Sequence, residues 1–208
     1  NRRPEAPVAA ALFYGRFVGH AHYDKMHLDL FAENVSMMPD FGYPETANSN
    51  DPRRFGFISH TVSHNTVMVD ARNQADARGR CLAYDAGPGV QYVEARNDGV
   101  YPQCSEYRRS VLMVEAEPGR CYLVDVFRVR GGSQHDWIVH GGHADFSANF
   151  ELPAPRQEGT LAGSEVPYGH YYDNAAMAAV PYGSANYAGY RGSGFQFLYG
   201  VREAALAP

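Results

Sequence analysis

Side chains that could bind a metal are concentrated between residues 19 and 65 of this 208-residue chain. His20 and His22 are separated by one residue, Asp40 follows an apolar run, and His64 precedes Asn65. Imidazole nitrogen and carboxylate oxygen are common ligands of zinc, and His22, Asp40 and His64 would supply two nitrogens and one oxygen while leaving one coordination position open. We therefore predict a site for one divalent metal, with Zn²⁺ as the expected ion.

The segment 20–24 could present three polar side chains together. If it is extended, His20, His22 and Asp24 lie on one face, because side chains alternate along a strand. His22 could then bind the metal while His20 faces a substrate, and Asp24 and Asn65 would support the site by hydrogen bonds without touching the ion. The alternative is that the histidines are hydrogen-bonded strand residues and that Asp40 caps a turn.

Other polar residues have weaker claims to a function. Tyr43 follows Asp40 closely, but in a chain with fifteen tyrosines a packing role is the alternative. The pairs Arg53-Arg54 and Arg108-Arg109 could bind a carboxylate or sulfate through paired hydrogen bonds, or could form solvated faces. A second histidine group fits a strand and its turn better than a metal site: His135, His140 and His143.

Composition excludes several classes of protein. The formal net charge of -5 argues against a general nucleic-acid binder, and a polyanionic partner would need a locally positive site. No apolar run approaches the roughly 18 residues of a membrane helix, so no membrane partner is expected. The three cysteines lack metal-type spacing and allow at most one disulfide.

Many short alternating segments separated by Gly and Pro turns indicate an all-β fold, a large antiparallel β-sandwich. We expect a lead-in segment over residues 1–12 and one sandwich domain over 13–208. The last third is expected to hold edge strands and long loops. The predicted strands are 27–32 and 35–38, joined as a hairpin, then 66–70, 89–95, 107–116, 121–129, 135–140 and 195–201.

Three sequence blocks, taken in order, resemble the heparinase II/III-like family of polysaccharide lyases, which includes alginate and glycosaminoglycan lyases. They are Gly19-His20-Ala21-His22-Tyr23-Asp24-Lys25, Pro39-Asp40-Phe41-Gly42 and Ser63-His64-Asn65-Thr66-Val67-Met68-Val69-Asp70. The resemblance implies an N-terminal (α/α) toroid followed by a large sandwich, of which this chain looks like the sandwich alone. It also implies zinc on His22, Asp40 and His64, and catalytic roles for His20 and Tyr43.

The implied reaction is β-elimination on a uronic-acid polysaccharide, in which the C5 proton is removed and the C4 oxygen leaves. An anionic polysaccharide or oligosaccharide and the toroid of the same protein would be its partners, in the bacterial periplasm or outside the cell. A related alternative is a C5 uronosyl epimerase, which returns the proton instead of eliminating. A third is a non-catalytic carbohydrate-binding sandwich with a structural metal, and a sandwich without metal is the remaining alternative.

Overall fold

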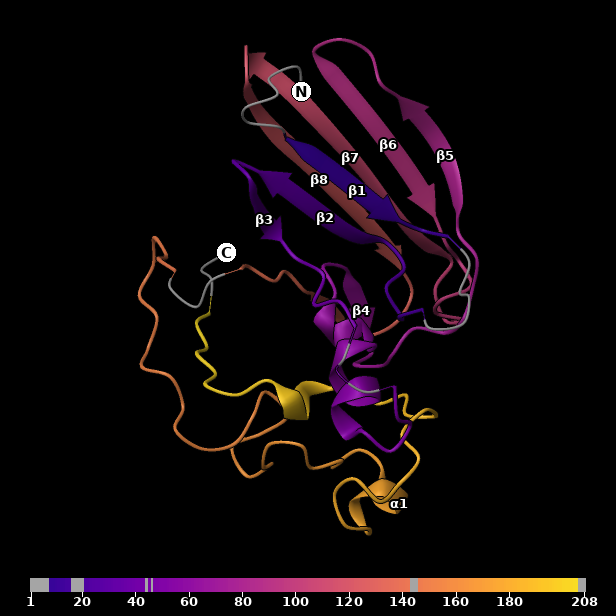
Figure 1. The fold of residues 1–208 in the computed structure, drawn as a ribbon, viewed down its shortest axis with the longest axis vertical. Coiled ribbons are helices and arrows are strands. Elements are labelled where there is room, and N and C mark those ends of the chain that lie inside the picture. The colour runs from indigo at the N-terminus through magenta and orange to yellow at the C-terminus, as the bar shows by residue number, and fades with distance from the viewer. Residues whose placement is uncertain (1–7, 16–20, 44, 46, 143–145, 206–208) are drawn as a thin grey trace.

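The computed structural model describes residues 8–15, 21–43, 45, 47–142 and 146–205, and their strands form three antiparallel sheets (Figure 1). The first sheet has the order β1-β2-β3, with β1 at Ala9–Phe13, β2 at His27–Ala32 and β3 at Val35–Met38. The second pairs β4 (Val67–Val69) with β9 (His135–Trp137). The third has the order β5-β6-β7-β8, at Arg80–Asp85, Val90–Arg96, Glu106–Glu117 and Arg120–Arg130.

The β2–β3 hairpin forms as predicted. Glu33 and Asn34 have φ values of 52° and 62°, which are the left-handed conformations that a two-residue hairpin turn requires. The hairpin ends at Met38, so that Asp40 stands just past its returning strand. Residues 9–12, predicted as part of the lead-in segment, belong to β1 and pair with β2; residues 1–7 lie outside the described ranges.

The long β7–β8 hairpin also matches the predicted strands and turns at Gly119, whose φ is +79°. Strand β5 was not expected, since an arginine-rich excursion stands there in the sequence. All of its residues are exposed and it pairs only with β6. An edge strand held by backbone hydrogen bonds need not show the alternation that marks a half-buried strand.

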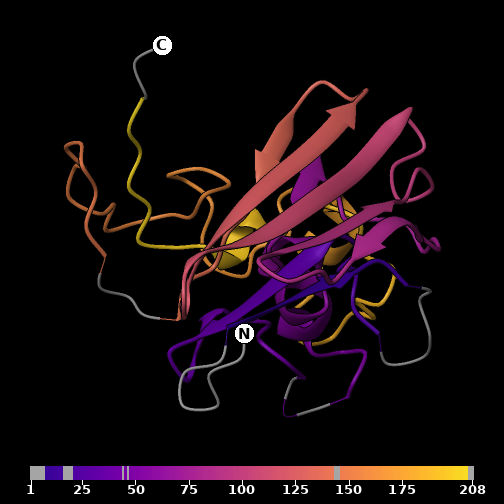
Figure 2. The same ribbon diagram turned by 90° about the horizontal axis from the view of Figure 1, so that it is seen from above.

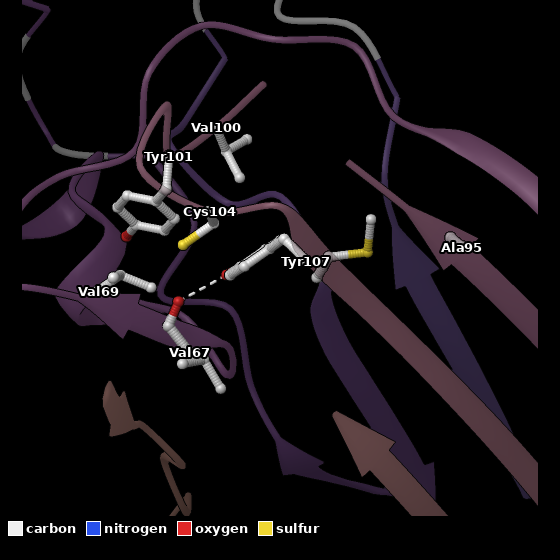
Figure 3. Close-up of a cluster of buried hydrophobic side chains, with 8 residues drawn as sticks. Val67, Val69, Ala95, Val100, Tyr101, Cys104 and Tyr107 are labelled. Carbon is white, nitrogen blue, oxygen red and sulfur yellow. Dashed lines mark hydrogen bonds between the residues drawn. The ribbon is translucent and has the colours of Figure 1, made fainter. Parts of the chain in front are cut away.

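Figure 2 shows the β1–β2–β3 sheet and the β5–β8 sheet as two layers. The main apolar cluster adjoins β4 and the start of β7, and its labelled members are drawn in Figure 3. Tyr107 contributes its ring to this cluster, while its hydroxyl donates to the backbone oxygen of Val67 at 2.5 Å. The buried members of the cluster are Met26, Val67, Val69, Ala95, Val100, Tyr101, Cys104 and Tyr107.

The described residues of the last third form loops as predicted, but none of the expected edge strands. The strand predicted over 195–201 is wrong: Phe195–Phe197 is a 3₁₀ turn, η3, that follows Gly194 at φ +73°. This turn directs Phe197 into a cluster with three buried tyrosines, Tyr171, Tyr187 and Tyr190. Aromatic packing thus replaces strand pairing in this region, which also holds the short helix α1 (Ala175–Ala178).

Two further findings concern the described residues. None of the helices in the described part of the chain has the length and apolarity needed to cross a membrane. Cys81, Cys104 and Cys121 are all free thiols, so the single disulfide that their number allows does not form.

Candidate metal centre

His22, Asp40 and His64 converge as the sequence predicts. One ligand atom from each residue lies within 4.8 Å of the others. His64 Nδ1 is 3.1 Å from Asp40 Oδ2, and His22 Nδ1 is 4.0 Å from Asp40 Oδ1. However, residues 21–24 are irregular rather than a strand, so His22 does not reach this position through strand alternation. His20 lies outside the described residues.

The donors of this cluster suit a divalent metal. His64 is fully buried, and neither of its ring nitrogens has a hydrogen-bond partner among the described atoms. A buried polar atom without a partner is costly. A metal held by His64, His22 and Asp40 would remove this cost, and two nitrogens with one oxygen match a zinc site that keeps a coordination position open.

The electrostatics of the cluster favour the protonation states that ligands need. Burial, followed by the proximity of His64, lowers the pKa of His22 below its ordinary value, so that the imidazole is neutral at pH 7. Burial raises the pKa of Asp40, but His64 and the backbone N–H of Gly42 outweigh burial and hold this pKa well below its usual range. His22 and Asp40 are therefore in the forms that bind a metal, a neutral imidazole and an ionised carboxylate.

Hydrogen bonds join the segment that carries His22 to the segment that carries His64. The backbone N–H of Tyr23 donates to Ser59 O at 2.9 Å, and Thr61 Oγ1 donates to Tyr23 O at 2.9 Å. Buried Gln74 accepts from Lys25 N at 2.8 Å and donates to Lys25 O at 2.9 Å. Sequence reasoning missed Gln74, because its role depends on a contact 49 residues away.

Arg109, in β7, holds the two ligand-bearing segments. Its guanidinium donates to the backbone oxygens of Met26 and Asn65, and pairs with both carboxylate oxygens of Asp125 at 2.9 and 2.6 Å. The side chain is fully buried. The suggestion that Arg109 binds a substrate carboxylate or sulfate is therefore wrong, because its donors are used inside the protein. Its partner in the pair, Arg108, contacts Glu94.

Asn65 braces the chain around the cluster. Its Nδ2 donates to Leu28 O at 3.2 Å and to Met38 O at 3.1 Å, and its Oδ1 accepts from the backbone N–H of His140 at 2.6 Å. It thus fixes the end of β3, two residues before Asp40. Its side-chain partners are backbone groups rather than imidazoles.

Asp24 has a different partner from the one expected. Its carboxylate accepts from Lys25 Nζ at 2.6 Å instead of from a ligand imidazole. Asp24 still influences the centre, since its charge partly offsets the lowering of the pKa of His22.

Tyr43 and Arg54 lie beside the cluster. The Tyr43 ring stacks on His22 with centroids 6.4 Å apart, and Arg54 Nη2 donates to Tyr43 Oη at 3.3 Å. Arg53, by contrast, is 58% exposed in its side chain and pairs with Asp51 at 3.5 Å. The structure thus separates the two neighbouring arginines, placing only Arg54 next to the cluster.

Three further histidines, His60, His135 and His140, bind backbone groups. His60 Nε2 contacts Gly192 O at 2.9 Å, and its Nδ1 accepts from Val62 N at 3.2 Å. His140 Nε2 contacts Val62 O at 2.9 Å, and His135 Nε2 contacts Gly131 O at 2.8 Å. The structural role expected for His135 and His140 fits these contacts; His143 lies outside the described residues.

A comparison with protein families matches residues 9–168 to "Heparinase II/III-like, C-terminal". The chain belongs to this family. Among solved structures, it is similar to the heparan sulfate lyase HepC from Pedobacter heparinus, with TM-score 0.51 and 21% identity over 60% of this chain. It is also similar to a heparinase III, the BT4657 gene product, with TM-score 0.55 and 19% identity over 74% of this chain.

At these identities the similarity establishes the fold, a heparinase-type β-sandwich. The chain spans about a fifth of the length of these structures, 19% of the first and 22% of the second. No curated protein matches the chain by sequence.

Proposed function

We propose that this chain is the metal-bearing sandwich part of a polysaccharide lyase that cleaves a uronic-acid-containing polymer by β-elimination. The observation that carries the proposal is the convergence of His22, Asp40 and His64 beside Tyr43 and Arg54. Family membership and the heparan sulfate lyase among the similar structures support the substrate class. A toroid in the same protein and a periplasmic or extracellular location are parts of the proposal.

The residues beside the cluster suit this chemistry. Removing the C5 proton builds negative charge next to the uronate carboxylate, so the site must place positive charge or hydrogen-bond donors there. A divalent metal bound by His22, Asp40 and His64 would supply such charge. Arg54 adds a guanidinium that already contacts Tyr43.

Tyr43 is proposed to exchange a proton with the substrate. Its hydroxyl accepts from Arg54, and a phenol in this position could give its proton to the leaving C4 oxygen. His20 is proposed as the base that faces the C5 proton, a role that follows from its place in the sequence motif.

The first test is the metal content of the full-length protein, measured by elemental analysis beside His22→Ala and His64→Ala. We expect about one zinc per chain in the parent and loss of this zinc in both variants. His135→Ala is the matched control, since His135 contacts Gly131 O, and it should keep the metal. A parent protein that stays without zinc, even when zinc is offered back, would contradict the metal centre.

The second test compares the neighbouring arginines during turnover of uronate polymers, followed by the absorbance of the unsaturated product. Arg54→Ala should lower kcat/KM by about 10²–10³, the range for losing one donor to a developing charge. Arg53→Ala should change it little, because Arg53 is solvated and pairs with Asp51. Inversion at C5 without a double bond would identify an epimerase, and binding without turnover would identify a carbohydrate-binding sandwich.

A further inference from the structure

A third imidazole lies inside the proposed metal centre. His27, the first residue of β2, is fully buried. Its ring packs edge-on against the ring of His64, with centroids 5.3 Å apart and an interplanar angle of 82°, and also against Phe13 at 5.5 Å. A histidine in this position could be a further metal ligand, or could hydrogen-bond to a ligand without touching the metal.

The hydrogen bond at Nδ1 decides between these roles. The backbone N–H of Asn65 donates to His27 Nδ1 at 2.9 Å, so Nδ1 carries no proton. The proton of a neutral imidazole with an accepting Nδ1 is on Nε2. A ring nitrogen that carries a proton has no free lone pair for a metal. Nε2 of His27 is therefore a donor and not a fourth ligand.

The Nε2–H group faces two carboxylates. Nε2 is buried without a hydrogen-bond partner among the described atoms, 3.6 Å from Asp29 Oδ1 and 4.0 Å from Asp40 Oδ2. Both distances exceed a hydrogen bond. The Asp29 side chain is 36% exposed and accessible to water, whereas Asp40 is 26% exposed and also lies against His64. Of these two carboxylates, Asp40 is the less exposed and the one that belongs to the proposed ligand set.

We propose that His27 is a positioning residue whose Nε2–H donates to Asp40 and fixes the orientation in which Asp40 presents its carboxylate to the metal. This inference rests on the proposed metal centre. Hydrogen bonds to ligating groups restrict their orientation, and their loss typically lowers metal affinity 10–100-fold. The sequence offers a simple reason why His27 was missed: it alternates with Leu28 as an ordinary strand residue would.

Two isosteric variants separate the two ends of the ring in the full-length protein. His27→Asn keeps an acceptor near the position of Nδ1 and removes the distant donor, whereas His27→Gln keeps a donor near the position of Nε2 and loses the acceptor for Asn65. We expect His27→Asn to lower the zinc affinity about 10–100-fold, measured by competition with a chelator. We expect His27→Gln to retain an affinity close to that of the parent.

Asp29→Asn is the matched control, because Asp29 is the other carboxylate that faces Nε2, and its affinity should stay close to that of the parent. The proposal is overturned if His27→Asn binds zinc normally, if His27→Gln loses as much affinity as His27→Asn, or if Asp29→Asn has the same loss. If the parent binds no zinc, the metal centre itself fails and this inference fails with it. Normal zinc binding by His27→Asn would remove only the role of His27.

A spectroscopic measurement on the parent protein does not depend on whether the variants fold. Long-range ¹H–¹⁵N correlation spectra of histidine-labelled full-length protein report which ring nitrogen carries the proton. We expect His27 to carry it on Nε2 both without zinc and with zinc bound. A proton on Nδ1 in the zinc-bound protein would mean that Nε2 is not a donor and is free to bind the metal, and would overturn the positioning role.

Discussion

The apolar cluster at the start of β7 and the interior around the proposed metal centre are equally buried but differ in chemistry. The first is made of aliphatic, aromatic and sulfur-containing side chains. The second is made of polar side chains with almost no exposed surface: His27, His60, Thr61, Ser63, His64, Asn65, Gln74 and Arg109. Tyr107 belongs to both, since its ring packs in the apolar cluster and its hydroxyl contacts Thr66 and Gln74.

The two interiors stabilise the protein in different ways. Apolar burial stabilises a fold without demanding direction. A buried polar network stabilises only when each donor and acceptor meets its partner, so it fixes positions more strictly and tolerates change less well. Side chains that must hold metal ligands in place are accordingly found in the polar interior, and substitutions there should cost more than their size suggests.

The largest effect is expected from breaking the polar interior at Arg109. Arg109→Met keeps much of the side-chain volume but leaves Asp125 and the backbone oxygens of Met26 and Asn65 without their donor. We expect the free energy of unfolding to fall by about 3–5 kcal/mol, as for removal of one partner of a buried ion pair. Urea denaturation measures the change. Arg120→Gln is the control and should leave stability nearly unchanged, because the Arg120 side chain is 81% exposed and its partner Glu117 is 67% exposed. A small loss of unfolding free energy in Arg109→Met would contradict the proposed difference between the polar interior and the apolar cluster.

A smaller effect is expected at Tyr107, where the two interiors meet. Tyr107→Phe retains the ring in the apolar cluster but leaves Val67 O without this donor, and also removes the contacts to Thr66 and Gln74. The expected loss in unfolding free energy is about 1–3 kcal/mol, the cost of buried groups without partners. Tyr101→Phe removes the hydrogen bond from a second buried hydroxyl, to Arg72 O, and should cost less. If thermal unfolding shows the same loss of unfolding free energy in both variants, the additional contacts of the Tyr107 hydroxyl contribute nothing to stability.

The smallest effect is a dependence of stability on pH that the polar interior has and the apolar cluster lacks. Burial lowers the pKa of His60 from 6.5 to about 3. Between these values the unfolded chain binds a proton that the folded chain excludes, so the unfolding free energy falls as pH falls below 6.5. Each pH unit in this window should cost on the order of 1 kcal/mol.

Urea denaturation of chelator-treated protein at pH 7.0 and 5.5 (about one unit below the ordinary histidine pKa) measures this slope. His60→Gln should make the slope shallower, whereas His135→Gln, at an exposed histidine, should not. An unchanged slope in His60→Gln would show that other groups carry the dependence.

Short-range patterns allowed much of the fold to be predicted. The alternation in residues 27–38 with Glu33-Asn34 between its halves specifies the β2–β3 hairpin, and the turn at Gly119 specifies the β7–β8 hairpin. The ligand set could be predicted because His22, Asp40 and His64 stand in recognisable sequence blocks. Their convergence is a geometric finding, and their role as ligands stays a prediction.

Features that depend on distant contacts could not be predicted. The helical turns η1 (Arg54–Ile58) and η2 (Thr61–Ser63) lie between the predicted strands 35–38 and 66–70, where the sequence pattern predicts no helix. The segment Phe195-Gln196-Phe197 reads as a strand by alternation, but aromatic packing after Gly194 makes it a 3₁₀ turn. The roles of Gln74 and Arg109 follow from partners far away in the chain, which no local pattern reveals.

The hydrogen bonds that join the two ligand-bearing segments also have a kinetic consequence. They connect residues 36 to 49 positions apart, whereas the β2–β3 hairpin between them uses neighbouring residues. Contacts between distant residues form more slowly because a long loop must first close. The hairpin should therefore form early in refolding and the proposed metal centre late. Zinc binding would then mark the last cooperative step, and its rate would report when the native topology is complete.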